Sequence, residues 1–456
     1  MLTWEQLRHF HRQPKIIGIW EEWFGPALRA LTPERRRLLL AVASLTVVFS
    51  HPWKELVAVS KEGPFNVTII AWLILASALF SFFALSYLAA KNFSALPAWI
   101  RRHPQLALHA SFWMPAILLW NLPPSDRMGR TLLAGWIAAL PFLLWRVGYL
   151  MMTAQHGKMA GTRFRDHLFY CYPIWTRTDI PYGKGWDYLS ANEAENAHAL
   201  ARSQLAGVKL FLLAGLWTIA RDLLNGVLFG TDNFYRRTLG TLAIPRPGDL
   251  FAHPETHSIA VSWLALYLDL FQHVLALAVL GHVIVGWMRF FGFNVFRNTY
   301  KPLLSQSVVE FWSRYFYYFK ELLVTFFFYP TFARYFRRKP RLRLFAAVFA
   351  AAFAGNIYYH CLIQKGPLVR GNFPEVWAAM QSRVFYSFLL AAGIGISMLR
   401  EQARARQKKP ARGRFQQIVA IFLVWTFFAI IHIWARDDPV PFVARCKFFL
   451  SLFGLP

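Results

Sequence analysis

Long apolar runs separated by short basic segments are the most regular feature of the chain. Three runs contain no Asp, Glu, Lys or Arg, at residues 66–90, 344–364 and 415–435. Six weaker or shorter runs lie at residues 38–53, 105–122, 131–152, 205–228, 257–287 and 376–399. Because about 20 apolar residues span the hydrocarbon core as a helix, the pattern predicts an all-α, polytopic integral membrane protein with about nine transmembrane helices.

The basic segments between these runs predict how the chain is oriented. Residues 334–343 and 400–414 are rich in Lys and Arg, as are residues 35–37 and 101–102. Lys and Arg accumulate in the cytoplasmic loops of membrane proteins. Placing all four segments in the cytoplasm lets the predicted spans alternate, with the N-terminus cytoplasmic and the C-terminus outside.

Composition excludes two other classes of basic protein. The 456 residues carry a formal net charge of +27, yet 56% are hydrophobic and 17% are aromatic. A disordered polycation lacks such aromatic content, and a nucleic-acid-binding protein would need a separable soluble domain. The lipid bilayer is therefore the expected partner of the positive charge, and no nucleic acid is expected. Three cysteines without a CxxC pair predict neither a disulfide framework nor a thiolate zinc site.

Two regions do not follow the spanning pattern. Residues 1–36 are Trp-rich and mixed in polarity, which predicts an interfacial segment ahead of one membrane-embedded domain over residues 37–456. Residues 289–340 are aromatic and basic together, which favours an interfacial or re-entrant helix. Within them Glu310 and Arg314 stand at i and i+4, the spacing of a helical ion pair.

One histidine stands out as a candidate catalytic group. His360 lies in the uncharged run 344–364, about 26 Å along a helix counted from Arg343. Asn356 falls one turn earlier on the same face and is expected to orient the imidazole by a hydrogen bond. The alternative is a packed histidine at a helix end. For His273, His282 and His432 the packing interpretation is preferred, because nothing around them in the sequence suggests chemistry.

A resemblance to a known family connects this histidine with the aromatic region. NTYKPLLSQS at residues 298–307, EFWSRY at 310–315 and YP at 329–330 resemble the signature of the membrane-bound O-acyltransferase (MBOAT) family. IYYH at 357–360 takes the place of that family's catalytic histidine element. The bacterial branch that acts in alginate O-acetylation and teichoic acid D-alanylation is the most similar, and the motif-bearing core covers residues 289–364.

The resemblance implies an MBOAT-like fold and an O-acyltransferase activity. An acyl group, expected to be acetyl, would pass from a cytoplasmic thioester such as acetyl-CoA to a hydroxyl of an exported polysaccharide or other envelope acceptor. His360 would be the general base, assisted by Asn356, with no bound cofactor and no metal. A periplasmic partner that hands on the acyl group is also implied. The expected substrate-binding residues are Asn298, Ser305, Ser307, Trp312, Arg314 and Lys320.

Three positions depart from the family pattern, and two other functions stay open. Phe316 stands where the family has His or Asn, Tyr315 replaces a Trp, and Cys361 replaces a Gly. Phenylalanine cannot transfer a proton, so another polar group would have to act at that site. Buried His, Asn and Lys side chains are also compatible with a non-enzymatic channel or transporter. The second of these functions is that of a lipid-modifying acyltransferase.

Overall fold

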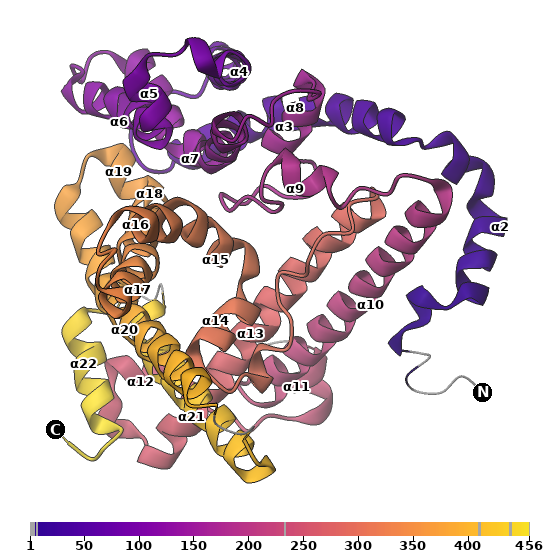
Figure 1. Ribbon diagram of the computed structural model, residues 1–456. Coiled ribbons are helices and arrows are strands. Elements are labelled where there is room, and N and C mark those ends of the chain that lie inside the picture. Colours follow the sequence, from indigo (N-terminus) through magenta and orange to yellow (C-terminus); the bar gives the residue numbers. More distant parts are fainter. Residues whose placement is uncertain (1–4, 6–7, 232–233, 409–411, 437–439, 456) are drawn as a thin grey trace. The chain divides into compact units, whose positions relative to one another are not determined.

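The computed structural model describes residues 5, 8–231, 234–408, 412–436 and 440–455 (Figure 1). Over these ranges the chain is helical and contains no β-strand, and an isolated β-bridge joins Glu193 and Phe293. This confirms the all-α class predicted from the apolar pattern.

Within the described ranges, seven helices are long and apolar enough to cross a membrane. They are Ile69–Lys91 (α4), Arg127–Gln155 (α7), Ala197–Val227 (α10), Ile259–Phe290 (α13), Pro340–Leu362 (α17, η6 and α18), Phe373–Arg406 (α20) and Arg414–Ala435 (α21). Each corresponds to one of the predicted runs. The chain is therefore a multi-pass membrane protein.

The other two predicted spans are helical but do not belong to this set. Residues 38–53 lie in α3 (Pro33–Val59), a helix that contains three consecutive arginines near its start and Lys54 and Glu55 near its end. Residues 105–122 correspond to α6 (Pro104–Asn121), which has only 18 residues and an internal proline. Charged residues in α3 and a lower mean hydropathy in α6 separate these helices from the seven apolar ones. The count of nine stays a prediction.

The chain forms two compact units, each assembled from discontinuous segments. Unit 1 comprises Met1–Lys209, Ile284–Phe296 and Leu362–Val376, and unit 2 comprises Leu210–Val283, Arg297–Cys361 and Trp377–Pro456. The boundary at residue 36 and the single embedded domain that follows it stay predictions.

Unit 1 is organised around α7. Its neighbours are α3, α4, α6, α8 (Phe164–Cys171), α9 (Trp186–Ser190) and α19 (Lys365–Arg370). Gly135 of α7 lets the helix approach α3 and α4, because an added Cβ would lie 2.8 Å from Leu56 and 2.6 Å from Leu75. The remaining helices of this unit are η1 (Phe10–Arg12), α2 (Pro14–Ala30), η2 (Phe93–Ala95) and α5 (Ala98–Arg102).

The predicted interfacial segment contains α2, an amphipathic helix. Ile17 and Leu28 pack in a hydrophobic cluster with Leu200, and the Trp20 indole donates to Gln204 Oε1 at 3.0 Å. Trp23 on the same helix is 71% exposed. A helix with one packed face and an exposed tryptophan is compatible with a bilayer surface, and the interfacial position of this segment stays a prediction.

Unit 2 contains residues 297–361 of the predicted motif-bearing core. Its elements, besides the parts of α10, α13 and α20 that it includes, are η4 (Pro302–Leu304), α14 (Val308–Tyr315), α15 (Tyr317–Leu323), η5 (Val324–Phe328), α16 (Tyr329–Arg334), α17 (Pro340–Phe349), η6 (Ala350–Gly355), α18 (Asn356–Leu362), α21 and α22 (Phe442–Ser451). Three short elements complete it: α11 (Phe234–Leu239), α12 (Pro247–Ala252) and η3 (Pro254–Thr256). Helix α16 packs against α17, which Figure 1 shows beside it.

Two π-helical turns, η5 and η6, pack against each other in this core. Gly355, the last residue of η6, permits the contact, because a Cβ at that position would lie 2.6 Å from the Phe327 ring. A π turn inserts an extra residue into a helix and rotates the face that follows it, and such turns are frequent at functional sites. Here the rotated segment is α18, which carries Asn356 and His360.

Candidate functional site

Local helix signals in the sequence build the first part of the predicted site. Ser307 is the N-cap of α14, and its hydroxyl accepts from the Glu310 amide at 3.3 Å. One turn along, Arg314 Nη2 lies 2.6 Å from Glu310 Oε1, which confirms the predicted helical ion pair. Ser307 and Arg314 are thus each engaged within α14 itself.

Asn298 binds the backbone at the N-terminus of α15. Its backbone carbonyl accepts from the Tyr317 amide at 2.9 Å, and its side-chain oxygen accepts from the Tyr318 amide at 3.3 Å. Gly281 makes room for it, since a Cβ there would lie 2.8 Å from Asn298 Cβ. Asn298 is only 1% exposed, and its Nδ2 has no hydrogen-bond partner among the described residues.

Phe319 on α15 connects the aromatic segment to His360. The Phe319 ring lies edge-on to Trp312 at 6.1 Å and to the partly buried His360 imidazole at 6.4 Å, measured between ring centroids. Tyr359 packs on the same ring at 4.8 Å. Two residues that the sequence assigns to the site, Trp312 and His360, therefore share one aromatic neighbour although they are far apart along the chain.

Lys320 is held on the neighbouring surface of α15. Its ammonium pairs with Glu321 and lies 4.9 Å from the centroid of the Tyr317 ring. The carboxylate and the ring face both stabilise a cation. Lys320 thus contacts residues close to it in the sequence, as does Arg314.

Asn356 does not make the hydrogen bond expected of it. Its side chain is fully buried, and neither amide atom has a partner among the described residues, so the predicted bond to the imidazole is absent. Ser305 is likewise buried, with a hydroxyl that lacks a partner. A buried polar group without a hydrogen bond lowers the free energy of unfolding by about 1–3 kcal/mol. The stability of the fold therefore gives no reason for such groups to be present.

A second polar cluster lies on α13 and α21. For the histidines of this cluster the sequence predicts only packing roles. Asp269 on α13 accepts from His432 Nδ1 at 3.1 Å through one carboxylate oxygen and from Arg436 through the other. The His273 ring lies 4.6 Å from that of His432. Tyr315 of α14 lies 6.2 Å from His273, and burial raises the pKa of this phenol well above its usual value of 10.

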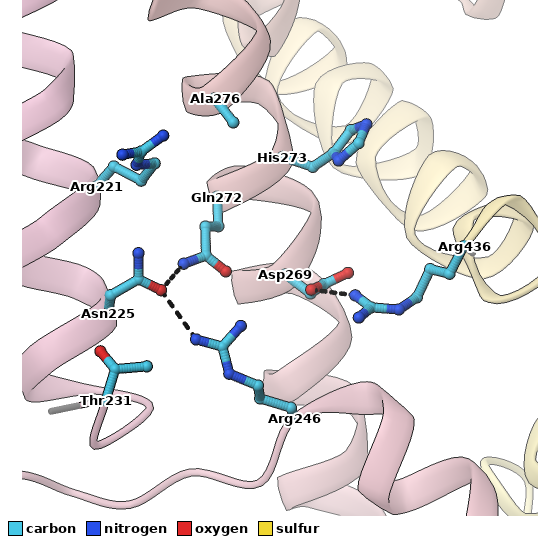
Figure 2. Close-up of a pocket in the computed structure, with 9 residues that line it drawn as sticks. All are labelled: Arg221, Asn225, Thr231, Arg246, Asp269, Gln272, His273, Ala276 and Arg436. Atoms are coloured by element: carbon cyan, nitrogen blue, oxygen red, sulfur yellow. Dashed lines mark hydrogen bonds and ion pairs between the residues drawn. The ribbon is translucent and has the colours of Figure 1, made fainter. Parts of the chain in front are cut away.

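This cluster borders a polar cavity of about 480 Å³ (Figure 2). The residues that line it are Arg221, Asn225, Thr231, Arg246, Asp269, Gln272, His273, Ala276 and Arg436. Figure 2 shows Gln272 and Arg246 converging on Asn225, and Asp269 turned toward Arg436. In the part of the chain that the structure describes, no group of three or more His, Cys, Asp and Glu is suited to hold a metal ion.

The structure revises the interpretation of two histidines. His432 is not merely packed but is hydrogen-bonded to a buried carboxylate, and His273 is exposed and lines the cavity. A usable signal was present in the sequence, because Asp269 is an acidic residue inside an apolar run and stands four residues before His273. His282 is buried and hydrogen-bonded to the Ala278 carbonyl, in keeping with a packing role.

Comparison with known proteins adds no identification. No family model matches the chain, and no curated protein matches it. The arguments for function therefore rest on the site itself and on the resemblance in residues 291–360.

Proposed function

We propose that this protein is a membrane O-acyltransferase of the MBOAT type, with His360 as its general base. The observation that carries the proposal is the environment of α18. A fully buried Asn356 presents an amide without a protein partner one turn before His360, and Phe319 joins His360 to Trp312 of the motif segment. Buried polar groups that cost stability and lie beside a candidate base are typical of catalytic sites.

The proposed reaction needs only groups that the chain supplies. The His360 imidazole takes the proton of an acceptor hydroxyl, and the oxygen attacks the thioester carbonyl to form a tetrahedral oxyanion. Collapse of that intermediate breaks the C–S bond, and the imidazolium returns the proton to the thiolate. The Asn356 amide is a hydrogen-bond donor suited to the oxyanion, a contribution that a donor on a packed helix makes without reorganisation.

In the proposal, Asn356 also helps to replace the polar group that is missing at Phe316. Phe316 ends α14 and packs on Phe319 with a centroid separation of 5.6 Å, so it supplies no polar atom to the site. Asn356, Asn298 and Ser305 each bring a buried polar atom that has no partner among the described residues. In the proposal these three residues replace the second polar group of the family.

The donor and the acceptor are proposed to arrive from opposite sides of the membrane. With the predicted orientation, basic residues at 334–343 face the cytoplasm and attract the phosphates of acetyl-CoA or another acyl-CoA. His360 is near the other end of the same spanning helix. In the proposed orientation it would face the outer side of the membrane, which the resemblance implies is the bacterial cytoplasmic (inner) membrane. An exported polysaccharide is the preferred acceptor, and a periplasmic partner that relays the acyl group is compatible with this arrangement.

The test is an acetyl-transfer assay with the purified full-length protein. Radiolabelled acetyl-CoA is incubated with the protein and envelope fractions, and label is followed into polysaccharide and into lipid. We expect label in polysaccharide with the native protein and its loss with His360→Ala. The control is His253→Ala, which removes an exposed imidazole. Full transfer by His360→Ala would overturn the proposal, whereas label in lipid would retain the chemistry and change the acceptor.

A transporter is the second candidate, and the Asp269 cluster favours it. Ionised side chains inside spanning helices are costly, and they often mark ion or proton pathways. Asp269, His432 and Arg436 form such a group beside a cavity. In proteoliposomes a transporter would carry solute or protons without transferring label, and Asp269→Asn would abolish that flux.

A further inference from the structure

The cavity of Figure 2 collects positive charge from three separate parts of unit 2. Arg221 projects from α10, Arg246 precedes α12 as its N-cap, and Arg436 follows the end of α21. Among the described residues that line the cavity, Asp269 is the only carboxylate. Three guanidinium groups therefore face one carboxylate across a single space.

Asp269 compensates the charge of only one of these arginines. Its two oxygens are used by Arg436 and His432. Arg221 is paired with its sequence neighbour Asp222 at 3.3 Å, and the two side chains are 34% and 42% exposed, respectively. A pair this exposed contributes little, so the Arg221 charge stays available to a ligand.

Arg246 is held in place by a neutral group instead of an acidic one. Its Nη2 donates to Asn225 Oδ1 at 3.1 Å, and Gln272 donates to the same oxygen. The guanidinium also lies 5.1 Å from the centroid of the Phe229 ring. These contacts orient the guanidinium of Arg246 but do not neutralise its charge. A guanidinium held in this way is suited to bind an anion.

We propose that this cavity is a binding site for a phosphate monoester. Neither Arg221 nor Arg246 bonds to Asp269, and their two guanidinium groups together suit the charged oxygens of a phosphate dianion. Guanidinium groups bind phosphate oxygens in pairs of parallel hydrogen bonds, and the amides of Asn225 and Gln272 add neutral contacts. A volume of about 480 Å³ also accommodates a glyceryl or sugar group attached to the phosphate.

The ligand has two chemical sources that share this headgroup. One is a lipid such as phosphatidic acid that enters from the bilayer, and the other is a soluble phosphate ester. The site does not depend on acyl transfer, because it involves none of the residues placed around His360. His360→Ala should therefore leave phosphate binding unchanged, and loss of one property does not imply loss of the other.

The experiment uses the full-length protein in a phosphate-free maltoside detergent. Binding of glycerol 1-phosphate is measured by titration calorimetry, and retention of phosphatidic acid is measured by native mass spectrometry. The test variant is Arg221→Gln/Arg246→Gln, and the matched control is Arg400→Gln/Arg406→Gln at the end of α20. We expect the test variant to weaken binding by about tenfold or more and the control to leave it unchanged.

A second variant protects the test against misfolding. Arg221→Lys/Arg246→Lys keeps both charges and loses the bidentate geometry, so it should fold normally and still bind more weakly than the native protein. Binding of glycerol 1-phosphate identifies a soluble ester, and binding of phosphatidic acid alone identifies a lipid. No binding of either probe by the native protein, or equal binding by all variants, would overturn the proposal.

Discussion

Two histidine environments in unit 2 differ in what surrounds the imidazole. The contacts of His360 include the rings of Phe319 and Tyr359, and the buried polar group one turn away, Asn356, is a neutral amide. His432 is instead bound to the carboxylate of Asp269, which also holds Arg436. One environment combines aromatic packing with an unused amide, and the other is an ion-pair network whose members satisfy one another.

The difference indicates which region is built for chemistry on a neutral substrate. A base that takes a proton from a hydroxyl works as neutral imidazole, and apolar surroundings favour that form. In the other region the hydrogen bonds join Asp269 of α13 to His432 of α21 and to Arg436 just after it, so they hold the two helices together. The difference supports the proposals that acyl transfer takes place in the His360 region and that the cavity beside the Asp269 network binds a ligand.

The largest expected effect separates the two histidines directly. His360→Ala should lower the rate of label transfer from acetyl-CoA by about 100-fold to 10,000-fold, the usual contribution of a general base. His432→Ala should keep most of the rate in the fraction of protein that remains folded. A drop of the same size in both variants would erase the distinction, and a larger drop for His432→Ala would reverse it.

Asn356 tests whether the unused amide serves the reaction. Asn356→Leu replaces a buried group without partners by an apolar one of similar size, so stability should be unchanged or slightly higher. Loss of an oxyanion donor should slow transfer by about 100-fold to 1,000-fold. Measuring both the rate and the thermal transition decides the matter, since a variant that is destabilised but fully active would assign Asn356 a structural role.

The Asp269 network should behave in the opposite way, with a large effect on stability. Asp269→Leu leaves the guanidinium of Arg436 without its carboxylate in a mostly buried position, at a cost of about 3–5 kcal/mol. Asp269→Leu/Arg436→Met should recover most of that loss, because no lone charge then remains. Unfolding by titration with SDS measures both variants. An Asp269→Leu protein as stable as the native one would contradict the assigned role.

His167 in unit 1 provides a third environment, buried with no hydrogen-bond partner on either ring nitrogen among the described residues. Burial lowers the pKa of His167 from 6.5 to about 4, so below pH 6.5 the unfolded chain takes up a proton before the folded one does. Stability should therefore fall as the pH drops from 6.5 to 4, by about 3 kcal/mol in total.

The measurement for His167 is unfolding free energy as a function of pH, with His167→Phe as the comparison. The Tyr87 ring lies 5.6 Å away, so an aromatic replacement keeps the packing. The difference between native and variant should be constant above pH 6.5 and grow in the variant's favour below it. Parallel curves across the whole range would show that His167 does not remain neutral in the fold.

Gly355 carries the smallest predicted effect and tests how the π turns position α18. Gly355→Ala places a methyl group 2.6 Å from the Phe327 ring and should cost about 1–3 kcal/mol. Phe327→Leu should recover part of the loss in the double variant. If Gly355→Ala alone is neutral in thermal unfolding, the contact between η5 and η6 does not determine the position of His360.

The sequence predicted the helical class and much of the motif segment because these depend on local signals. Apolar run length marked the spanning helices, and Ser307, Glu310 and Arg314 form their helix contacts within eight residues. Asn356 was assigned a hydrogen bond from spacing alone, and that inference failed. Helical register shows which residues share a face, but the packing of neighbouring helices decides which polar atoms meet.

Contacts between residues far apart in the sequence, and the π turns, could not be predicted from the pattern of apolar and polar residues. Asp269 and His432 are separated by 163 residues and meet only because α13 and α21 pack together. Nothing in the alanine-rich run around residue 350 distinguishes a π turn from an α-helix, and only the structure shows that η6 ends at Gly355, where it packs against the Phe327 ring. The cavity arginines come from three such distant segments.

The most direct test of the central claim is the acyl content of envelope polymers in the host cell. Mass analysis compares cells that carry the native protein, cells that lack it and cells that carry His360→Gln at the same membrane level. The account predicts acylated polymer in the first and a matching loss in the other two. An acyl content that is the same in all three would contradict it.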